Sequence, residues 1–193
     1  MQGHRLSIFA EMSMLAAETG AINLGQGFPD TDGPTEVLDA AVAAIRAGHN
    51  QYPPDRGIPE LRRAVAEHQD RFYGQEVDPD DVMVSTGASE AIGAAIMALV
   101  SEGQEVVVFE PYFDLYAAVI ALAGGVRRAV TLRAPDYSFD EAQLAAAIGP
   151  ETRLILLNTP HNPTGKVFSL EELGVIARLA VQHDLLVVTD EVY

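Results

Sequence analysis

The chain has no cysteine, a single lysine and no long apolar run. Without cysteine it cannot form disulfides, thiolate metal sites or a thiol nucleophile. Its histidines are His4, His49, His68, His161 and His183. They lack the spacing of metal ligands, so we expect no metal. No stretch approaches the roughly 18 consecutive apolar residues of a membrane span, and the first residues lack the regions of a secretion signal, so we expect a cytoplasmic protein.

Basic residues are also scarce. Lys and Arg number 12 against 28 Asp and Glu, which gives a formal net charge of -16. Nucleic acids and anionic membranes favour clustered positive charge, so we expect neither as a partner. Apolar residues are abundant, because 48% of the 193 residues are hydrophobic. This is enough for a sizeable core, in one large domain or in part of a larger protein.

After residue 80, short β-rich runs alternate with longer alanine-rich helical patterns. This order predicts an α/β fold built around a mainly parallel sheet. The expected strands cover residues 81–85, 105–109, 127–132, 153–158 and 185–190. The expected helices cover about 89–101, 112–123, 139–148 and 169–183. At the start of the last helix, Ser169 and Glu172 fit a capping box.

The first part of the chain is organised differently. A loop, LGQGFPDTDGP, precedes an expected helix at about 34–47, with Pro34 near its start and Gly48 past its end. A proline-rich stretch and a further helix at about 58–73 then lead into the βα part. We expect residues 1–47 to form an N-terminal arm and helix, and residues 48–193 to form the βα domain.

Small residues join the first expected strand to its helix, where the sequence reads STGASEA. At Gly87, Ala88 and Ser89 the backbone can approach an anion closely, and the free N–H groups of the first helical turn and the Ser89 hydroxyl can bind it. This pattern suits a phosphate. Taken alone it is weak, because strand–glycine–helix junctions occur in many α/β proteins.

Two later junctions carry aromatic and amide side chains. Tyr112 or Phe113, directly after the second strand, would stack on a planar ring or simply pack in the core. Asn158 and Asn162 flank a proline-rich loop after the fourth strand. An amide held in such a loop can donate to a ligand oxygen, although Asn-Pro also makes an ordinary turn.

The chain closes on TDEVY, directly after the fifth strand. A carboxylate such as Asp190 at a buried sheet edge needs a cationic or hydrogen-bonding partner, or else it caps the next helix. Tyr193 can turn a phenol toward the same place. Together the four junctions offer an anion cradle, a stacking ring, an amide, a carboxylate and a phenol at one edge. This is the set of groups that binds pyridoxal 5'-phosphate.

Across essentially all 193 residues, the sequence resembles the class I/II aminotransferases of pyridoxal-phosphate fold type I. The matching stretches are INLGQGFPD, QYPPDRGIPELR, STGASEA, EPYFDLY, NTPHNPTGKVFS and TDEVY. It is most similar to the kynurenine/glutamine aminotransferase-like enzymes and the N-succinyldiaminopimelate aminotransferases. The resemblance implies a three-layer αβα large domain, here incomplete, at 48–193, with residues 1–47 part of the small domain of complete members.

The resemblance also assigns roles to individual residues. It implies that Gly87, Ala88 and Ser89 hold the cofactor phosphate and that Phe113 stacks on the ring. Asn162 and Tyr193 would bond the phenolic oxygen, and Asp190 would pair with the pyridinium nitrogen. Asn162 would also contact substrate, and the Gly27 backbone would approach the substrate carboxylate. Tyr52 would reach the phosphate of a neighbouring subunit's cofactor, which implies a homodimer.

The single lysine, Lys166, does not match the family's cofactor-binding lysine, which lies well after the TDEVY segment. It follows the Asn-Pro-Thr-Gly turn, where the family pattern has a surface charge. We therefore expect an N-terminal part of an aminotransferase that is inactive alone, acting in its complete form on an L-amino acid and a 2-oxo acid. The alternatives are a carbon–sulfur β-lyase on the same scaffold and a non-catalytic module that keeps the cofactor pocket.

Overall fold

The structure is a computed structural model that describes residues 8–27, 29 and 31–193, without the side chain of Phe9. The chain divides into two compact units between Leu61 and Arg62, and each unit is described by itself. The expected division at residue 47 concerned domains of the complete protein, and it stays a prediction.

The first unit is helical. Helix α1 spans Ile8–Thr19 and α2 spans Thr35–Arg46, and α3, Pro59–Tyr73, begins at the division. Pro34 is the N-cap residue of α2, and its φ of -54° suits a helix start. None of the α2 residues is buried, so the apolar face that holds Val37 and Ile45 is exposed within this unit.

A four-stranded sheet forms the centre of the second unit. Its strands are β1 (Glu105–Glu110), β2 (Val126–Thr131), β3 (Thr152–Asn158) and β4 (Leu186–Asp190). They lie in the order β2-β1-β3-β4 and every neighbouring pair is parallel. The prediction of a parallel sheet is therefore confirmed, with strand ends shifted by about one residue. The carboxyl ends of β3 and β4 meet where Asn158 pairs with Asp190.

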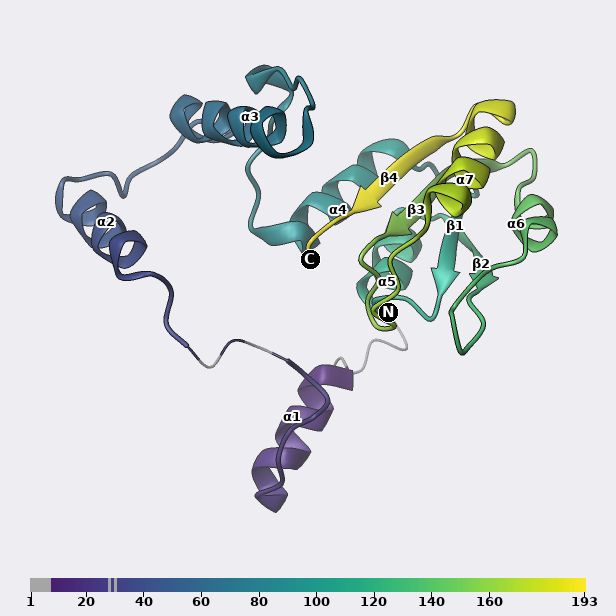
Figure 1. The fold of residues 1–193 in the computed structure, drawn as a ribbon, viewed down its shortest axis with the longest axis horizontal. Coiled ribbons are helices and arrows are strands. Elements are labelled where there is room, and N and C mark those ends of the chain that lie inside the picture. Colours follow the sequence, from purple (N-terminus) through teal and green to yellow (C-terminus); the bar gives the residue numbers. More distant parts are fainter. Residues whose placement is uncertain (1–7, 28, 30) are drawn as a thin grey trace. The chain divides into compact units, whose positions relative to one another are not determined.

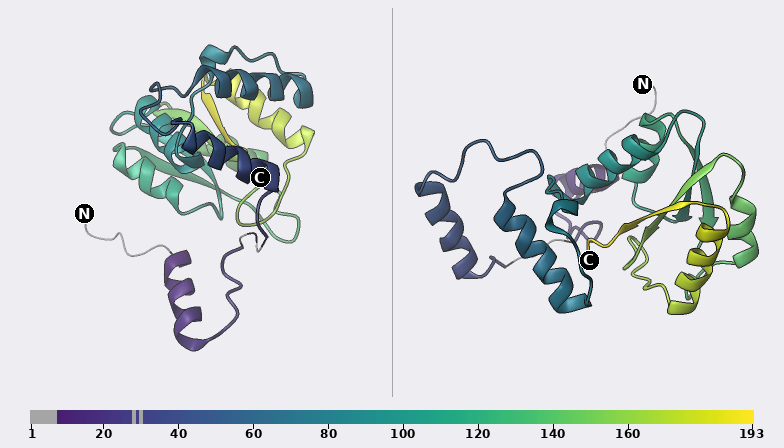
Figure 2. Two further views of the ribbon diagram at one scale, coloured as in Figure 1. Left: turned by 90° about the vertical axis from the view of Figure 1, so that its left-hand side faces the viewer. Right: turned by 90° about the horizontal axis from the view of Figure 1, so that it is seen from above.

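Helices cover both faces of this sheet (Figures 1 and 2). The helices that cover it are α4 (Gly87–Leu99), α5 (Leu115–Leu122), α6 (Glu141–Ala147) and α7 (Leu170–Gln182). Val106 and Val108 of β1 pack with α4 and α5 on one face. Val107 and Phe109 pack with α6 and α7 on the other. Because successive residues of a strand point to opposite faces, the apolar residues 106–109 of β1 are buried on both sides of the sheet.

Two helix starts follow their sequence signals. At α7 the Ser169 hydroxyl accepts from the Glu172 N–H, and the Glu172 side chain accepts from the Ser169 N–H, which confirms the capping box. At α6 the Asp140 carboxylate accepts from the Ala142 N–H at 2.8 Å. Such caps each contribute about 1 kcal/mol. They fix where the helices begin relative to the strands before them.

The expected strand at 81–85 is wrong. Pro79–Asp81 instead forms a short 3-10 turn, in which the Asp78 carboxylate accepts from the Asp80 N–H. Val82 is extended, with φ -88° and ψ 130°, but residues 82–85 pair with no strand among the described residues. A β-rich pattern makes a strand only where a neighbouring strand completes its hydrogen bonds.

Within the described part of the chain, no helix has both the length and the apolar character needed to cross a membrane.

Candidate functional site

The carboxyl edge of the sheet in the second unit contains a cavity of about 240 Å³. Its walls come from the start of α4, the segment after β1, the loop after β3 and the segment after β4. The lining residues are Ala88, Ser89, Ile92, Phe113, Asn162, Asp190, Val192 and Tyr193. Six of the predicted site residues therefore lie around one cavity, although they are far apart in the sequence.

The first turn of α4 forms one wall of the cavity. Gly87 has a φ of +73°, which a residue with a Cβ adopts only under strain, so glycine is required where the chain turns into the helix. The N–H groups of Ala88 and Ser89, and the Ser89 hydroxyl, have no hydrogen-bond acceptor among the described residues. Donors at a helix N-terminus favour an anion. Gly87 itself is not a lining residue.

Of the two aromatic candidates, Phe113 lines the cavity. Its ring makes an edge contact with Tyr116, with centroids 5.9 Å apart. Tyr112 instead packs against the core, and Arg127 lies over its ring at 5.3 Å. The structure thus separates a ring that faces the cavity from one that has a packing role.

Asp190 is the buried acid of the cavity, with an exposed fraction of 7%. Its Oδ2 accepts a hydrogen bond of 2.5 Å from the Tyr116 phenol, and its Oδ1 accepts from the Val192 N–H at 3.2 Å. Burial, and then the bond to Asp190, raise the pKa of Tyr116, so this phenol stays a donor at physiological pH. Tyr116 was not among the site residues expected from the sequence. Its position three residues after Phe113, on the same side of a helical turn, was the available signal.

The two asparagines of the loop after β3 have different environments. The Asn158 amide is 3% exposed and bonds the backbone of its own and a neighbouring segment. It is therefore not available to a ligand. Asn162 lies in the loop wall of the cavity. Gly165, with a φ of +73°, closes this loop by donating its N–H to the His161 carbonyl at 2.7 Å.

Lys166 is not the surface charge that the sequence suggested. Its side chain is 9% exposed, and its Nζ lies 2.8 Å from Oε1 of Glu172, the residue that also completes the α7 capping box. The ammonium also lies 5.2 Å from the Phe168 ring centroid. Lys166 does not line the cavity. Its stem packs against apolar surface while its charge is paired, as is common for long side chains.

Histidines do not form a metal site in the described residues. Neither they nor the carboxylates there gather in a group of three or more that would hold an ion. His161 is buried, its Nδ1 lies 2.8 Å from the Thr164 hydroxyl, and burial lowers its pKa. It therefore stays neutral near pH 7 and holds the loop. His4 lies outside the described residues.

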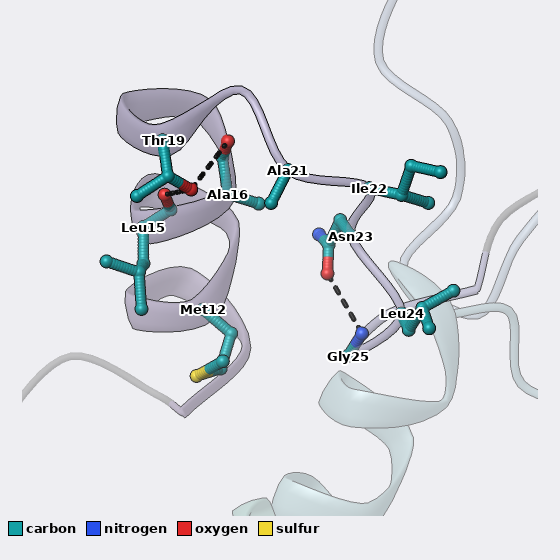
Figure 3. Close-up of a pocket in the computed structure, with 9 residues that line it drawn as sticks. All are labelled: Met12, Leu15, Ala16, Thr19, Ala21, Ile22, Asn23, Leu24 and Gly25. Carbon is teal, nitrogen blue, oxygen red and sulfur yellow. Dashed lines mark hydrogen bonds between the residues drawn. The ribbon is translucent and has the colours of Figure 1, made fainter.

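Gly27 and Tyr52 belong to the first unit, where Tyr52 is 99% exposed. Their predicted roles remain predictions. A hollow of about 330 Å³ in this unit lies between α1 and the segment after it (Figure 3). Met12, Leu15 and Ile22 are among its apolar walls, and an Asn23 side chain that accepts from the Gly25 N–H at 2.9 Å shapes the segment. No ionisable side chain lines it.

Curated relatives match the whole chain but only part of their own length. A probable N-succinyldiaminopimelate aminotransferase of Mycobacterium tuberculosis is 49% identical over 100% of this chain and 49% of its own length. The methionine aminotransferase of Escherichia coli is 43% identical over 97% of the chain and 49% of its own length. The chain thus spans about half the length of the curated relatives it matches.

Solved structures show the same architecture. The N-succinyldiaminopimelate aminotransferase of M. tuberculosis superimposes with a TM-score of 0.92 at 50% identity, over 96% of this chain and 49% of that one. An aspartate aminotransferase of Thermus thermophilus gives 0.90 at 36% identity, over 100% and 52%. The fold is that of the fold type I aminotransferases. Residues 19–193 match the family described as aminotransferase class I and II, and the chain belongs to that family.

Proposed function

We propose that the complete protein containing this chain transfers an amino group between an L-amino acid and a 2-oxo acid, with pyridoxal 5'-phosphate as cofactor. Family membership supports the reaction class. The observation that carries the proposal is the cavity in which buried Asp190, Phe113 and the first turn of α4 face one space. The names of the relatives refer to different substrates, namely N-succinyldiaminopimelate, methionine and kynurenine. We therefore propose a class of reaction and no particular amino acid.

The chemistry of the cavity fits that cofactor at both of its ends. A phosphate needs N–H and hydroxyl donors, and the first turn of α4 offers those of Ala88 and Ser89. A protonated pyridine nitrogen needs a buried anion, and Asp190 is the buried carboxylate of the cavity. Gly87 would contribute through its positive φ, which lets the chain turn so that these N–H groups point toward the phosphate.

When bound, the cofactor supplies a ring that withdraws electrons from the amino acid's α-carbon. In our proposal Asp190 holds the proton on the pyridine nitrogen, and the Tyr116 phenol orients the Asp190 carboxylate. Phe113 would cover the ring and exclude water. Asn162 and Tyr193 would donate to the phenolic oxygen, and Asn162 would also contact substrate.

We further propose that this chain alone does not turn over substrate. Its single lysine, Lys166, is paired with Glu172 and is absent from the cavity walls. The amine that binds the cofactor covalently would then be supplied from outside residues 1–193. A carbon–sulfur β-lyase would use the same residues.

The remaining assignments follow from the family resemblance. We propose a homodimer in which Tyr52 reaches the phosphate bound to the neighbouring subunit and the Gly27 backbone approaches the substrate carboxylate. Exposure of Tyr52 within its unit agrees with such a contact. We also propose the division into residues 1–47 and 48–193, and a cytoplasmic location.

The test is Asp190→Asn in the complete protein. The amide keeps the shape and can still accept from the Tyr116 phenol, but it no longer favours the protonated pyridine. We expect turnover to fall by at least about a hundredfold, a loss that corresponds to about 2.7 kcal/mol. Affinity for pyridoxal phosphate should fall much less.

The matched control is Asp140→Asn, which keeps a good cap on α6 outside the cavity walls. Its turnover should equal that of the wild type. Near-normal turnover in Asp190→Asn would remove Asp190 from the assigned role.

A further inference from the structure

Two residues that line the cavity belong to different segments of the chain. Asp190 ends β4, whereas Asn162 lies in the loop that follows β3. Under the proposed function, on which this inference rests, both side chains contact the same cofactor ring at different atoms. Their separation must therefore be held within narrow limits. Asn158, the last residue of β3, is hydrogen-bonded to the backbone of both segments.

The Asn158 side chain uses both its donors and its acceptor on backbone groups. Its Nδ2 donates to the Asp190 carbonyl at 2.8 Å and to the Pro160 carbonyl at 3.0 Å. Its Oδ1 accepts from the Asn162 N–H at 2.6 Å. The residue is 3% exposed and does not line the cavity. Buried amides that are fully bonded in this way hold their partners in one arrangement.

Backbone contacts at the same place add to this arrangement. Asn158 pairs with Asp190 in the parallel register, and the Asp190 carbonyl also accepts from the Thr159 N–H at 3.1 Å. The end of β4 is thus bonded both by the backbone and by the side chain of the β3 end. Thr159 and the buried His161, which bonds the Phe109 backbone, also hold the loop that leads to Asn162, but the bond to the Asn162 N–H itself comes from the Asn158 side chain.

Asparagine has a chemistry that other side chains of this size lack. Aspartate of the same shape offers no donor at neutral pH, and leucine offers neither donor nor acceptor. Either change leaves buried backbone groups without partners, which costs more than the bond itself. We propose that Asn158 is a positioning residue that fixes Asn162 relative to Asp190, so that both meet the cofactor ring, without touching the ring itself.

The experiment compares two probes in the complete protein. The first is 4-deoxypyridoxine 5'-phosphate, which has the ring and the phosphate but no aldehyde, so its binding needs no lysine. The second is inorganic phosphate, which tests the first turn of α4 alone. The variants are Asn158→Leu, which removes all three bonds, and Asn158→Asp, which keeps the acceptor for the Asn162 N–H. A third readout, hydrogen exchange of the backbone N–H of Asn162 (below, the Asn162 amide), needs no ligand.

The matched control is Thr152→Val at the other end of β3. The Thr152 hydroxyl accepts from the Gly149 N–H at 2.8 Å and lies 3.3 Å from Glu105, so this variant also loses hydrogen bonds, here half-buried ones. We expect Asn158→Leu to weaken the ring probe about tenfold, the effect of one lost hydrogen bond. Phosphate affinity should change less than about twofold. Thr152→Val should leave both affinities unchanged.

Hydrogen exchange of the Asn162 amide separates the bond that Asn158 makes to Asn162 from those that it makes to Asp190 and Pro160. In Asn158→Leu the Asn162 amide should exchange at least about ten times faster. In Asn158→Asp it should stay protected while the ring probe still weakens, and this variant replaces Asn158→Leu if the latter does not fold. Equal weakening of both probes, unchanged ring binding in a folded variant, or unchanged exchange of the Asn162 amide in Asn158→Leu would overturn the proposal.

The wild-type protein tests the cofactor separately. If it binds the ring probe no more tightly than phosphate, the proposed function fails. The Asn162 amide then still decides whether Asn158 fixes this loop.

Discussion

The phenol of Tyr116 donates to the carboxylate of Asp190 across 74 positions of sequence, from α5 to the end of β4. The contact joins the layer of helices on one face of the sheet to the acid in the cavity. It gives a buried carboxylate the donor that its burial demands.

The Tyr116 phenol should stay protonated in the folded protein, so replacing Tyr116 by Phe should leave the absorbance titration of the tyrosines unchanged. Burial and the bond to Asp190 raise its pKa, so the folded protein keeps this proton above pH 10, where an unfolded tyrosine loses it. Absorbance at 295 nm, titrated to about pH 11 in folded protein, should rise equally in the wild type and in Tyr116→Phe. A smaller rise in the variant would mean that Tyr116 titrates normally.

The same pKa shift predicts how stability depends on pH. The folded pKa of Tyr116 is raised above the unfolded one, so its stabilising contribution is complete below about pH 10 and declines as pH rises further. Urea unfolding of the wild type at pH 8 and at pH 10.5 should show this decline. Tyr116→Phe should lose the part that belongs to this residue, and an identical decline in both proteins would contradict the assignment.

Gly87→Ala should strain the start of α4. The positive φ of +73° is unfavourable for alanine, and the expected loss of stability is about 1–2 kcal/mol. Because the first turn would shift, affinity for inorganic phosphate should fall as well. Gly93→Ala in the same helix is the control, since its Cβ would meet Val119 at an ordinary 3.8 Å. That change should be neutral or stabilising by about 0.5–1 kcal/mol.

Lys166→Met should lower stability without changing cofactor chemistry. The change removes one partner of a pair whose side chains are 9% and 19% exposed, at a cost of about 1–3 kcal/mol. Borohydride treatment with pyridoxal phosphate, followed by peptide mapping, should leave wild-type Lys166 unmodified because Glu172 holds its ammonium. Modified Lys166 would show that it reaches the cofactor. Arg178→Met, which breaks a half-exposed pair with Glu141, should cost less than about 1 kcal/mol.

The 193-residue chain expressed by itself should associate. Strand β4 lies at an edge of the sheet, where Leu186 and Val187 are more than a third exposed. An unpaired apolar edge favours pairing with another chain. Light scattering should therefore show species larger than a monomer that grow with concentration. A monodisperse monomer that melts cooperatively would refute this expectation.

Local pattern in the sequence determined much of this protein. The runs at 105–109 and 153–158 became buried parallel strands, because short, mainly apolar stretches between helical patterns have few other solutions. Ser169 and Glu172 placed the start of α7, because a cap needs only residues three positions apart. The site could be located at the carboxyl edge, since parallel strands bring their ends together there.

Tertiary structure decided which groups meet across long separations. Only the tertiary structure shows that the Tyr116 phenol donates to Asp190 and that Asn158 bonds both Asp190 and Asn162. The same holds for the pair of Lys166 and Glu172. Residues 82–85 read as a strand but have no partner strand in the described chain. The physical reason is common to these cases: periodicity and caps depend on neighbours in sequence, whereas strand pairing and buried hydrogen bonds depend on groups that sequence distance does not bring together.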